Sequence, residues 1–235
     1  MNRRARGFVL VLVLAMLVVL ALLAGGIAAT TARLAEQSQQ RAQRMQDAVD
    51  MASTRATVLY LLSPAKSLDF TTPLPELAHT APHFKADSAR LVDALRGLSP
   101  QALASLMSIS DELAHLNVAR YQAWSTRSTV RNSRQAVLAF DGDVYAGLQA
   151  RTLSEADLEW AQRHVRILSG LYGVLRPLDR MQPYRLEMGT ALPVGDAPNL
   201  YAYWGTRIAE HLNRTLAADA SPVVVNLASQ EYARA

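Results

Sequence analysis

Residues 63–66 read Ser-Pro-Ala-Lys and match the S-x-x-K spacing of serine acyl-enzymes, in which a serine hydroxyl is the nucleophile. Penicillin-binding proteins, which use this motif, also need a Lys-Thr-Gly triplet. The chain has two lysines, Lys66 and Lys85, and neither is followed by Thr-Gly. The sequence therefore excludes that class of acyl-enzyme. It also has no cysteine, which excludes thiol nucleophiles, disulfides and cysteine-ligated metal sites.

Two groups of residues have the types that bind metal ions. His79 and His83 have the spacing of ligands on one helix face, but a proline between them disrupts that helix, so we interpret both as solvated loop histidines. Asp141 and Asp143 could hold a hard cation together with Glu187 through oxygen ligands. A turn after a strand explains both aspartates without a metal, and we expect neither a metal nor a cofactor.

The basic residues are unevenly distributed. Residues 1–57 hold seven arginines against three acidic residues, which accounts for the whole net charge of +4 and leaves the rest of the chain neutral. Within that neutral part, residues 120–134 carry four arginines and no acid, and residues 163–187 carry five arginines against Asp179 and Glu187. Clusters of this kind are what contact with phosphate groups requires. A solvated surface is the alternative, and charge alone favours it.

Residues 169–173, Ser-Gly-Leu-Tyr-Gly, place Gly170 and Gly173 in an apolar setting. Glycines three apart let a hairpin bring backbone N–H groups close to a phosphate, although the same pattern serves any tight turn. The following Arg176 could clamp a phosphate with two hydrogen bonds or pair with a nearby carboxylate. Tyr184 is suited to stacking on a base, but we favour core packing for it.

Short apolar strands and helices must position these residues. Residues 57–62, 137–140 and 222–227 are short apolar runs, which predicts three buried strands. Ser154 and Asp157 have the spacing of a capping box at a helix start. Helical patterns cover residues 86–98, 100–107, 110–124, 154–164 and 203–218. Strands that alternate with helices of this length predict an α/β fold in which helices wrap a mixed central sheet.

Residues 8–29 contain neither a charge nor a proline, and as a helix they would span the hydrocarbon layer of a membrane. Three arginines precede this segment, so the positive-inside rule predicts a single-pass inner-membrane anchor whose following body is exported. A cleaved signal peptide fits so long an apolar run less well. We therefore divide the chain into an anchor with a polar helical stretch, residues 1–57, and a folded body, residues 58–235.

The junction Arg6-Gly7-Phe8, the apolar run and the polar stretch behind it resemble the start of type IV pilin-like proteins, of which the minor pseudopilins of type II secretion are the nearest. The resemblance implies a leader that is cut after Gly7 and an apolar helix that anchors the subunit. Most members carry a glutamate five residues into the mature chain, where this sequence has Leu12, which fits only the atypical minor subunit. A generic signal anchor is the alternative.

The body resembles the YaaA peroxide stress family in six blocks that occur in the family's order. The blocks are SPAKSLDF (63–70), ISDELAHLNVARY (109–121), AFDGDVYAGL (139–148), LSGLYGVLRPLDRMQPYRLEMGT (168–190), LYAYWG (200–205) and VVNLASQEY (224–232). Family members start near the strand before the first block and continue beyond the last one, so we expect a YaaA-like domain, residues 58–235, that is incomplete at its carboxyl end. The block residues that we single out are Ser63, Pro64, Gly142, Asp143, Tyr145, Tyr172, Pro177, Tyr184, Glu187, Asn226, Ser229 and Glu231.

This resemblance implies a cytoplasmic protein that limits damage by hydrogen peroxide and intracellular iron. It also implies non-specific binding of double-stranded DNA in a basic cleft with a helix-hairpin-helix-like element. No reaction is firmly attached to the family, so we expect binding rather than turnover. The residues that we expect to contact phosphate are Lys66, Arg166, Arg176 and Arg185, with Gly170 and Gly173 shaping the hairpin.

Two alternatives stay open. The chain could be a membrane-anchored secretion or pilus-type component with a passenger body. It could also be an enzyme that uses Lys66, Asp143 and Glu187, for a reaction that the motifs do not define. Compartment separates the first alternative from DNA binding, because a body in the periplasm cannot reach chromosomal DNA.

Overall fold

The computed structural model describes residues 57–217 and 221–235. These residues belong to one compact unit of the chain, which extends from Arg55 to Ala235. The predicted membrane helix at residues 8–29 and the pseudopilin-like junction lie outside the described residues. Among the helices that the structure does describe, none has the length and apolar character that crossing a membrane requires.

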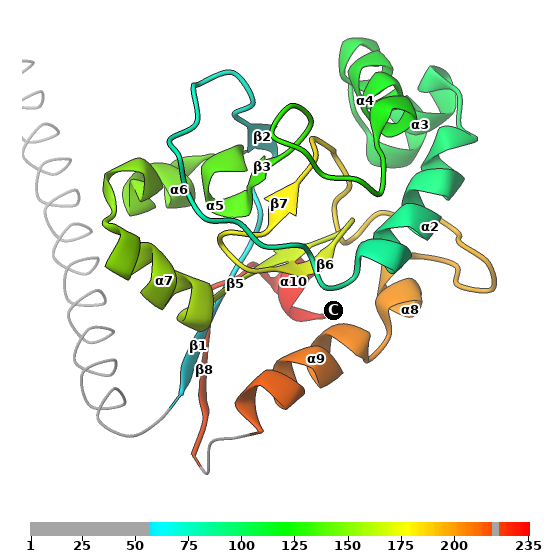
Figure 1. Ribbon diagram of the computed structural model, residues 1–235. Coiled ribbons are helices and arrows are strands. Elements are labelled where there is room, and N and C mark those ends of the chain that lie inside the picture. Colours follow the sequence, from blue (N-terminus) through cyan, green and yellow to red (C-terminus); the bar gives the residue numbers. More distant parts are fainter. Residues whose placement is uncertain (1–56, 218–220) are drawn as a thin grey trace, which may run out of the picture. The chain divides into compact units, whose positions relative to one another are not determined.

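A mixed four-stranded sheet forms the centre of this unit, in the order β6-β5-β1-β8 (Figure 1). Strand β1 (Val58–Leu62) runs parallel to β5 (Val165–Ser169) on one side and to β8 (Val223–Asn226) on the other. Strand β6 (Gly173–Leu175) turns back antiparallel to β5. The predicted mixed sheet and the strands predicted at 57–62 and 222–227 are therefore confirmed.

Four of the predicted helices form close to their predicted bounds: α2 (Lys85–Arg96), α3 (Pro100–Met107), α4 (Asp111–Ala123) and α7 (Glu155–His164). Serine side chains cap α3, α4 and α7, and at α7 the capping box of Ser154 and Asp157 is complete. Apart from α9, the remaining elements have six residues or fewer. They are β2 (Ser67–Leu68), β3 (Arg134–Gln135), α5 (Ala136–Ala139), β4 (Phe140–Asp141), α6 (Asp143–Leu148), a 3₁₀ turn (Ala150–Thr152), β7 (Arg180–Met181), α8 (Leu200–Trp204), α9 (Arg207–Leu216) and α10 (Gln230–Ala233).

The strand predicted at residues 137–140 is wrong. Residues Ala136–Ala139 form α5, all four of them buried, and a two-residue strand, β4, follows. The backbone N–H of Val137 donates to the carbonyl of Pro177, so this segment bonds to a loop rather than to the central sheet. Burial explains the apolar run equally well in either conformation, and a run of this length does not separate helix from strand.

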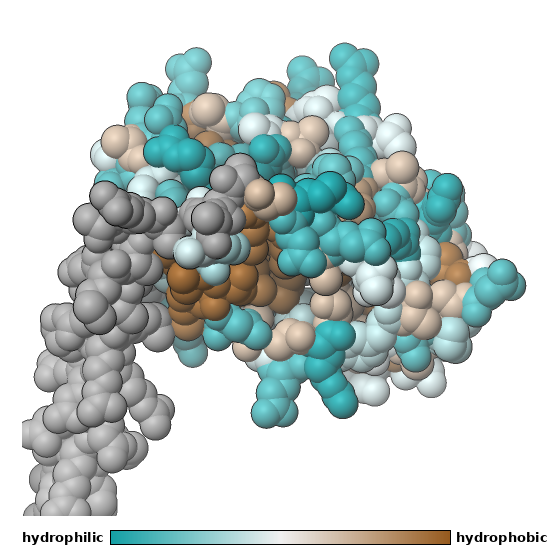
Figure 2. All heavy atoms as spheres, turned by 90° about the horizontal axis from the view of Figure 1, so that it is seen from below, coloured by the Kyte–Doolittle hydropathy of each residue, from teal (hydrophilic) through white to brown (hydrophobic). Residues whose placement is uncertain are grey.

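Two further predictions need correction near the carboxyl end. The helix predicted at 203–218 is broken into α8 and α9, because Gly205 takes a left-handed conformation with φ of 51°. The strand predicted as buried at 222–227 lies at the edge of the sheet, where Val224 is 47% exposed. Figure 2 shows the molecule from below relative to Figure 1, and apolar side chains gather on this face.

The main core lies where α2, α8 and the β5–β6 turn meet. Trp204 is fully buried there, packs edge-on against Phe84 at 5.3 Å between ring centroids, and donates its indole N–H to the carbonyl of Gly170 over 3.0 Å. Tyr172 accepts a hydrogen bond from the indole of Trp124, also at 3.0 Å. These bonds satisfy the polar atoms of the large aromatic side chains, so that the core holds the β5–β6 turn firmly in place.

Candidate functional site

Several of the block residues converge on one pocket, which we call the motif pocket. It is lined by Ser63, Pro64, Ala65, Lys66, Tyr184, Arg185, Leu186, Glu187, Ser229, Glu231 and Tyr232, and it encloses about 590 Å³ including its mouth. The parallel pairing of β1 with β8 explains this convergence. Residues 63–66 follow the carboxyl end of β1 and residues 229–232 follow that of β8, and the carboxyl ends of parallel strands lie at the same edge of a sheet.

Two cations share one carboxylate in the motif pocket. The ammonium of Lys66 lies 3.2 Å from Glu187 Oε2, and Arg185 Nη2 lies 2.9 Å from Glu187 Oε1. The Lys66 side chain is 68% exposed, whereas that of Arg185 is 18% exposed. An exposed pair contributes at most about 1 kcal/mol, so Lys66 can exchange its partner for another anion while Arg185 stays bound.

Other block residues fix the loops around this pocket. The hydroxyl of Ser63 accepts the backbone N–H of Ser229 at 2.8 Å, and the Tyr145 hydroxyl donates to the carbonyl of Ser63 at 2.8 Å. Glu231 accepts the backbone N–H of Gly189 at 2.7 Å. Burial raises the pKa of Tyr145 well above its ordinary value, so this phenol keeps the proton that it donates.

Tyr184 is buried in the core, although it also contributes to the lining of the motif pocket. Its hydroxyl lies 2.6 Å from that of Ser169, and its ring packs edge-on against Tyr172. Tyr184 is 5% exposed and Tyr172 is 2% exposed, so neither ring is free to stack on a base. Burial raises the pKa of both phenols. The block tyrosines therefore hold the pocket wall in position.

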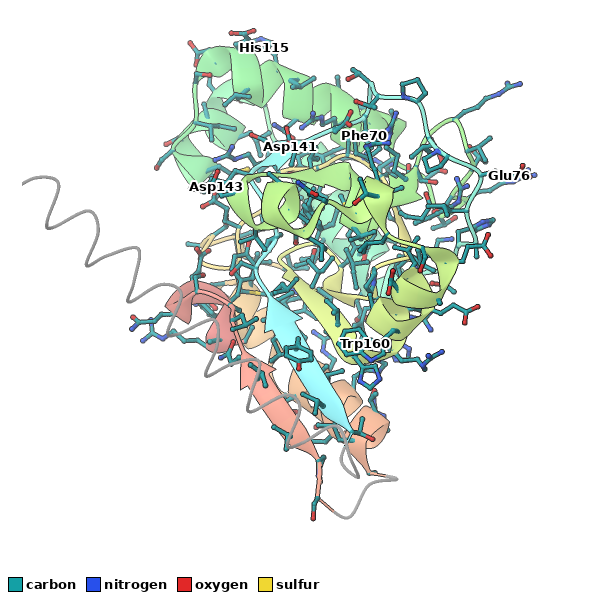
Figure 3. The ribbon with its side chains drawn as sticks, turned by 90° about the vertical axis from the view of Figure 1, so that its left-hand side faces the viewer. Phe70, Glu76, His115, Asp141, Asp143 and Trp160 are labelled. Atoms are coloured by element: carbon teal, nitrogen blue, oxygen red, sulfur yellow. The ribbon has the colours of Figure 1, made fainter. Side chains whose placement is uncertain are left out.

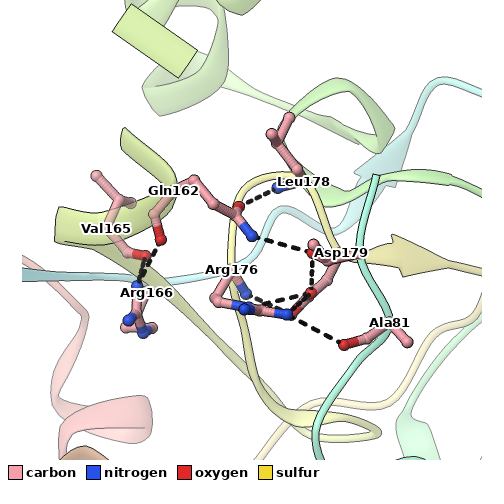
Figure 4. Close-up of polar contacts among 8 residues, drawn as sticks. Ala81, Gln162, Val165, Arg166, Arg176, Leu178 and Asp179 are labelled. Atoms are coloured by element: carbon pink, nitrogen blue, oxygen red, sulfur yellow. Dashed lines mark hydrogen bonds and ion pairs between the residues drawn. The ribbon is translucent and has the colours of Figure 1, made fainter. Parts of the chain in front are cut away.

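Two of the predicted phosphate contacts, Arg166 and Arg176, lie away from the motif pocket. Arg166 is 5% exposed and donates through Nη1 to the carbonyls of Gln162 and Val165 (Figure 4). The same atom donates to the carbonyl of Arg163, so Arg166 closes the carboxyl end of α7. Arg176 binds the buried carboxylate of Asp179 through Nε and Nη2. Of the two roles that the sequence allows for Arg176, the structure shows the ion pair.

The glycine turn is not a helix-hairpin-helix element, which corrects the prediction. Residues 169–173 join two antiparallel strands, with Ser169 paired to Gly173. A Cβ on Gly170 would overlap the Leu186 carbonyl oxygen, and one on Gly173, which has a φ of 67°, would lie 2.8 Å from the Trp204 ring. The turn is buried, so its N–H groups do not face a solvent-borne phosphate. The glycines serve close packing instead.

The remaining block residues have local roles. Gly142 precedes α6, and Asp143 is the exposed first residue of that helix, beside Asp141 (Figure 3). The side chain of Asn226 accepts the backbone N–H of Ala228 at the end of β8. Pro177 supplies the carbonyl that binds α5. Because Asp143 does not line the motif pocket, the predicted grouping with Lys66 and Glu187 is met only in part.

The two groups of candidate metal ligands, His79 with His83 and Asp141 with Asp143 and Glu187, do not form metal sites in the part of the chain that the structure describes. Within residues 57–217 and 221–235, no three histidine or acidic side chains are placed to hold a metal ion. His83 stacks on His211 of α9, with 4.0 Å between ring centroids, whereas His79 lines a different pocket. Burial, together with electrostatic interactions with His83 and Arg166, lowers the pKa of His211 to about 4.

This lowered pKa predicts a pH dependence of stability. The folded pKa of His211 lies below its ordinary value of 6.5, so the unfolded chain takes up the proton first as the pH falls. His211 should therefore cost stability progressively between about pH 6.5 and pH 4. In His211→Phe, which keeps a ring for the stack, the melting temperature should fall less than in the parent between pH 7 and pH 5. If the melting temperatures of the variant and the parent fell by the same amount over that range, the lowered pKa of His211 would be contradicted.

One pocket lacks a counterpart in the sequence predictions, and we call it the α2 pocket. It is lined by His79, Thr80, Ala81, Lys85, Thr126, Arg127, Ser128 and Arg180. Arg127 and Arg180 fall in the two arginine-rich stretches, but Lys85 lies in neither. The sequence signal was the excess of arginine, and it could not show that three distant segments meet at one place.

Comparison with known proteins gives one consistent result. Residues 58–235 match the family model described as peroxide stress protein YaaA. The chain is 69% identical over 176 residues to a UPF0246 protein of Paracidovorax citrulli, an alignment that covers 74% of this chain and 68% of the relative. A UPF0246 protein of Polaromonas naphthalenivorans is 65% identical over 175 residues, with the same two coverages. One from Bordetella petrii is 61% identical, again over 74% of this chain and 68% of the relative.

Proposed function

The chain belongs to the YaaA peroxide stress protein family, and from this premise we propose that it limits damage by hydrogen peroxide and iron by binding double-stranded DNA. The proposed contacts are to backbone phosphates and therefore carry no sequence preference. Binding, rather than turnover, is the proposed activity. The residues that make the contacts differ in part from those that the sequence suggests.

The loop between α4 and β3 supports this proposal best. Arg127 and Arg131 are exposed, and neither forms an ion pair with any residue that the structure describes. No acidic residue occurs between positions 120 and 134 to neutralise them. The other two arginines of this stretch are engaged within the protein, since Arg134 donates to the carbonyl of Thr72 and Arg120 to Asn117.

The same loop is held rigidly, which reduces the entropy lost on binding. Gln182, which is 3% exposed, accepts the backbone N–H of Ser125 and donates to its carbonyl. At the other end, Asn132 accepts the backbone N–H of Thr129 at 2.7 Å. Unpaired arginines on a fixed, acid-free loop are suited to phosphate contact. Lys66, whose side chain is 68% exposed, is a further proposed contact at the motif pocket.

We expect the full chain, purified in detergent, to bind duplexes of unrelated sequence equally and to lose affinity steeply as salt rises. Each phosphate contact contributes a slope of about −0.9 to the plot of log affinity against log salt. The double variant Arg127→Gln/Arg131→Gln should make this plot less steep, by the contribution of about two phosphate contacts. Fluorescence anisotropy at several salt concentrations measures both quantities. An equal effect of the charge-matched control Arg90→Gln/Arg163→Gln, or affinity that does not depend on salt, would refute the proposal.

The proposal also requires that the body lie in the compartment of the DNA. The segment at residues 8–29 predicts export of the body. A reporter fused after Ala235 distinguishes the two locations: green fluorescence in cells supports DNA binding, whereas alkaline phosphatase activity places the body in the periplasm and contradicts it.

A further inference from the structure

We propose that the α2 pocket binds a phosphate monoester, the doubly charged terminal group of a phosphorylated molecule. This inference goes beyond contact with the DNA backbone, because inorganic phosphate alone should occupy the pocket. The phosphate could belong to a small molecule or to the 5′ end of a nucleic acid, and duplexes with 5′-phosphate and 5′-hydroxyl ends separate these sources.

Three cations from three segments line the α2 pocket. Lys85 is the first residue of α2, Arg127 belongs to the loop before β3, and Arg180 is the first residue of β7. No carboxylate is among the lining residues. Asp179 adjoins Arg180 in the chain, but its Oδ1 already accepts bonds from Arg176 and Thr80, and its Oδ2 accepts the backbone N–H of Arg176.

Arg180 is the observation that points to a ligand. The residue is 7% exposed, and its Nε is buried without any hydrogen-bond partner. Its Nη1 has one long bond, 3.4 Å, to the carbonyl of Ser133, and no acidic group in the described part of the chain pairs with it. A buried cation without a counter-charge is strongly unfavourable. A bound anion would supply the negative charge that Arg180 lacks.

The backbone holds this guanidinium in place beside the pocket. Arg180 pairs with Gln135 across the β3–β7 ladder, and its N–H donates to the carbonyl of Thr80 at 2.9 Å. Because Thr80 also lines the pocket, the β7 strand and the loop before α2 form one wall. The position of Arg180 therefore does not depend on a ligand, and the pocket is organised before binding.

Uncharged donors complete the set. Helix α2 is 12 residues long, and no side chain caps its amino end at Phe84, so the N–H groups of its first turn have no capping acceptor there. A helix amino terminus favours anions through these N–H groups and through its dipole. Thr126 and Ser128 add hydroxyls to the opposite lining. Cations, N–H groups and hydroxyls together match a tetrahedral oxyanion.

A monoester fits this site better than a phosphodiester does. A terminal phosphate carries up to two negative charges and three free oxygens, which suits three converging cations. A diester carries one charge and must extend in two directions. The α2 pocket encloses about 690 Å³ including its mouth, which leaves room for the group that bears the phosphate.

Calorimetric titration of the full chain with inorganic phosphate tests the proposal. We expect one phosphate to bind per chain and Lys85→Gln to weaken binding at least about tenfold, because the substitution removes a hydrogen bond between two charged groups. Arg90→Gln, which removes an equal charge from the same helix outside the pocket, should leave the affinity unchanged. Arg180→Gln should abolish binding, with its melting temperature recorded to show that it folds.

Duplexes with 5′-phosphate and 5′-hydroxyl ends identify the source. A preference of the parent chain for the phosphorylated end, lost in Lys85→Gln, assigns the pocket to nucleic-acid ends. Equal binding of both duplexes, with phosphate still bound, assigns it to a small phosphorylated molecule. Absence of phosphate binding at millimolar concentration, or an equal loss in Arg90→Gln, overturns the inference. Binding of the 5′-hydroxyl duplex reports separately on the proposed DNA contact.

Discussion

Replacing Gly170 by alanine should destabilise the protein by about 4 kcal/mol or more, which is beyond the range of most single substitutions. The new Cβ would overlap the backbone oxygen of Leu186 and lie 3.0 Å from the carbon of the same carbonyl. Both atoms belong to the main chain, so no flexible side chain can move aside. The Gly170 carbonyl also accepts the indole N–H of Trp204, so a shift of the turn would break a buried hydrogen bond as well.

Gly147→Ala is the matched control. Gly147 lies in α6, no atom approaches its Cβ position within 4 Å, and its φ is not positive. Alanine there should be neutral or stabilise the protein by about 0.5–1 kcal/mol. Urea unfolding of both variants measures the difference. If Gly170→Ala unfolded like the parent and lost only DNA affinity, the turn would be a phosphate-binding hairpin after all.

The elements that could be predicted are those with signals inside the element itself. Strand β1 is an apolar run that begins with the β-branched Val58, and α7 begins at a capping box formed by residues 154–157. Helix α3 begins at a serine followed by proline, and the structure has both at those positions. Such signals depend on neighbours within a few residues, and they need no knowledge of the fold.

The features that were predicted wrongly from the sequence depend on residues that lie far apart along the chain. Residues 136–139 form α5 rather than a strand because the 177–179 segment binds their backbone. The sequence shows that arginines are abundant, but not which carboxylate each one meets. Glu187 forms ion pairs with both Lys66 and Arg185, so two predicted phosphate contacts share one carboxylate within the protein. The α2 pocket, in turn, gathers residues from positions 79 to 180.

The motif pocket shows the same division. The blocks that line it could be recognised in the sequence, and their convergence follows once β1 and β8 are known to be parallel neighbours. What each block residue contributes could not be derived in advance. Ser63 and Glu231 use their side chains to bind backbone N–H groups of distant loops, which is a structural role that their residue types do not reveal.

Replacing Asp179 by asparagine should destabilise the protein by about 1–3 kcal/mol, because it takes an acceptor from donors that meet a buried carboxylate, while the 41% exposed Arg176 side chain can still be solvated. Asp179 is 2% exposed and accepts bonds from the Arg176 backbone at 2.8 Å, from the Arg176 guanidinium at 3.0 and 3.2 Å, and from Thr80 at 2.5 Å (Figure 4). Asparagine fills the same volume, but its NH₂ group cannot accept a hydrogen bond. At least one of these donors would lose its acceptor in a buried setting.

The control for this substitution is Asp93→Asn. Asp93 pairs with Arg96 at 3.1 Å on the surface of α2, where its side chain is 69% exposed, so its loss should cost less than about 1 kcal/mol. Urea unfolding compares the two variants. The DNA affinity of Asp179→Asn then discriminates between the two roles of Arg176. If the variant stayed as stable as the parent and bound DNA more tightly, the arginine would be a phosphate contact that Asp179 restrains. A loss of stability without a gain in affinity is expected, because Arg176 holds the turn between β6 and β7 closed.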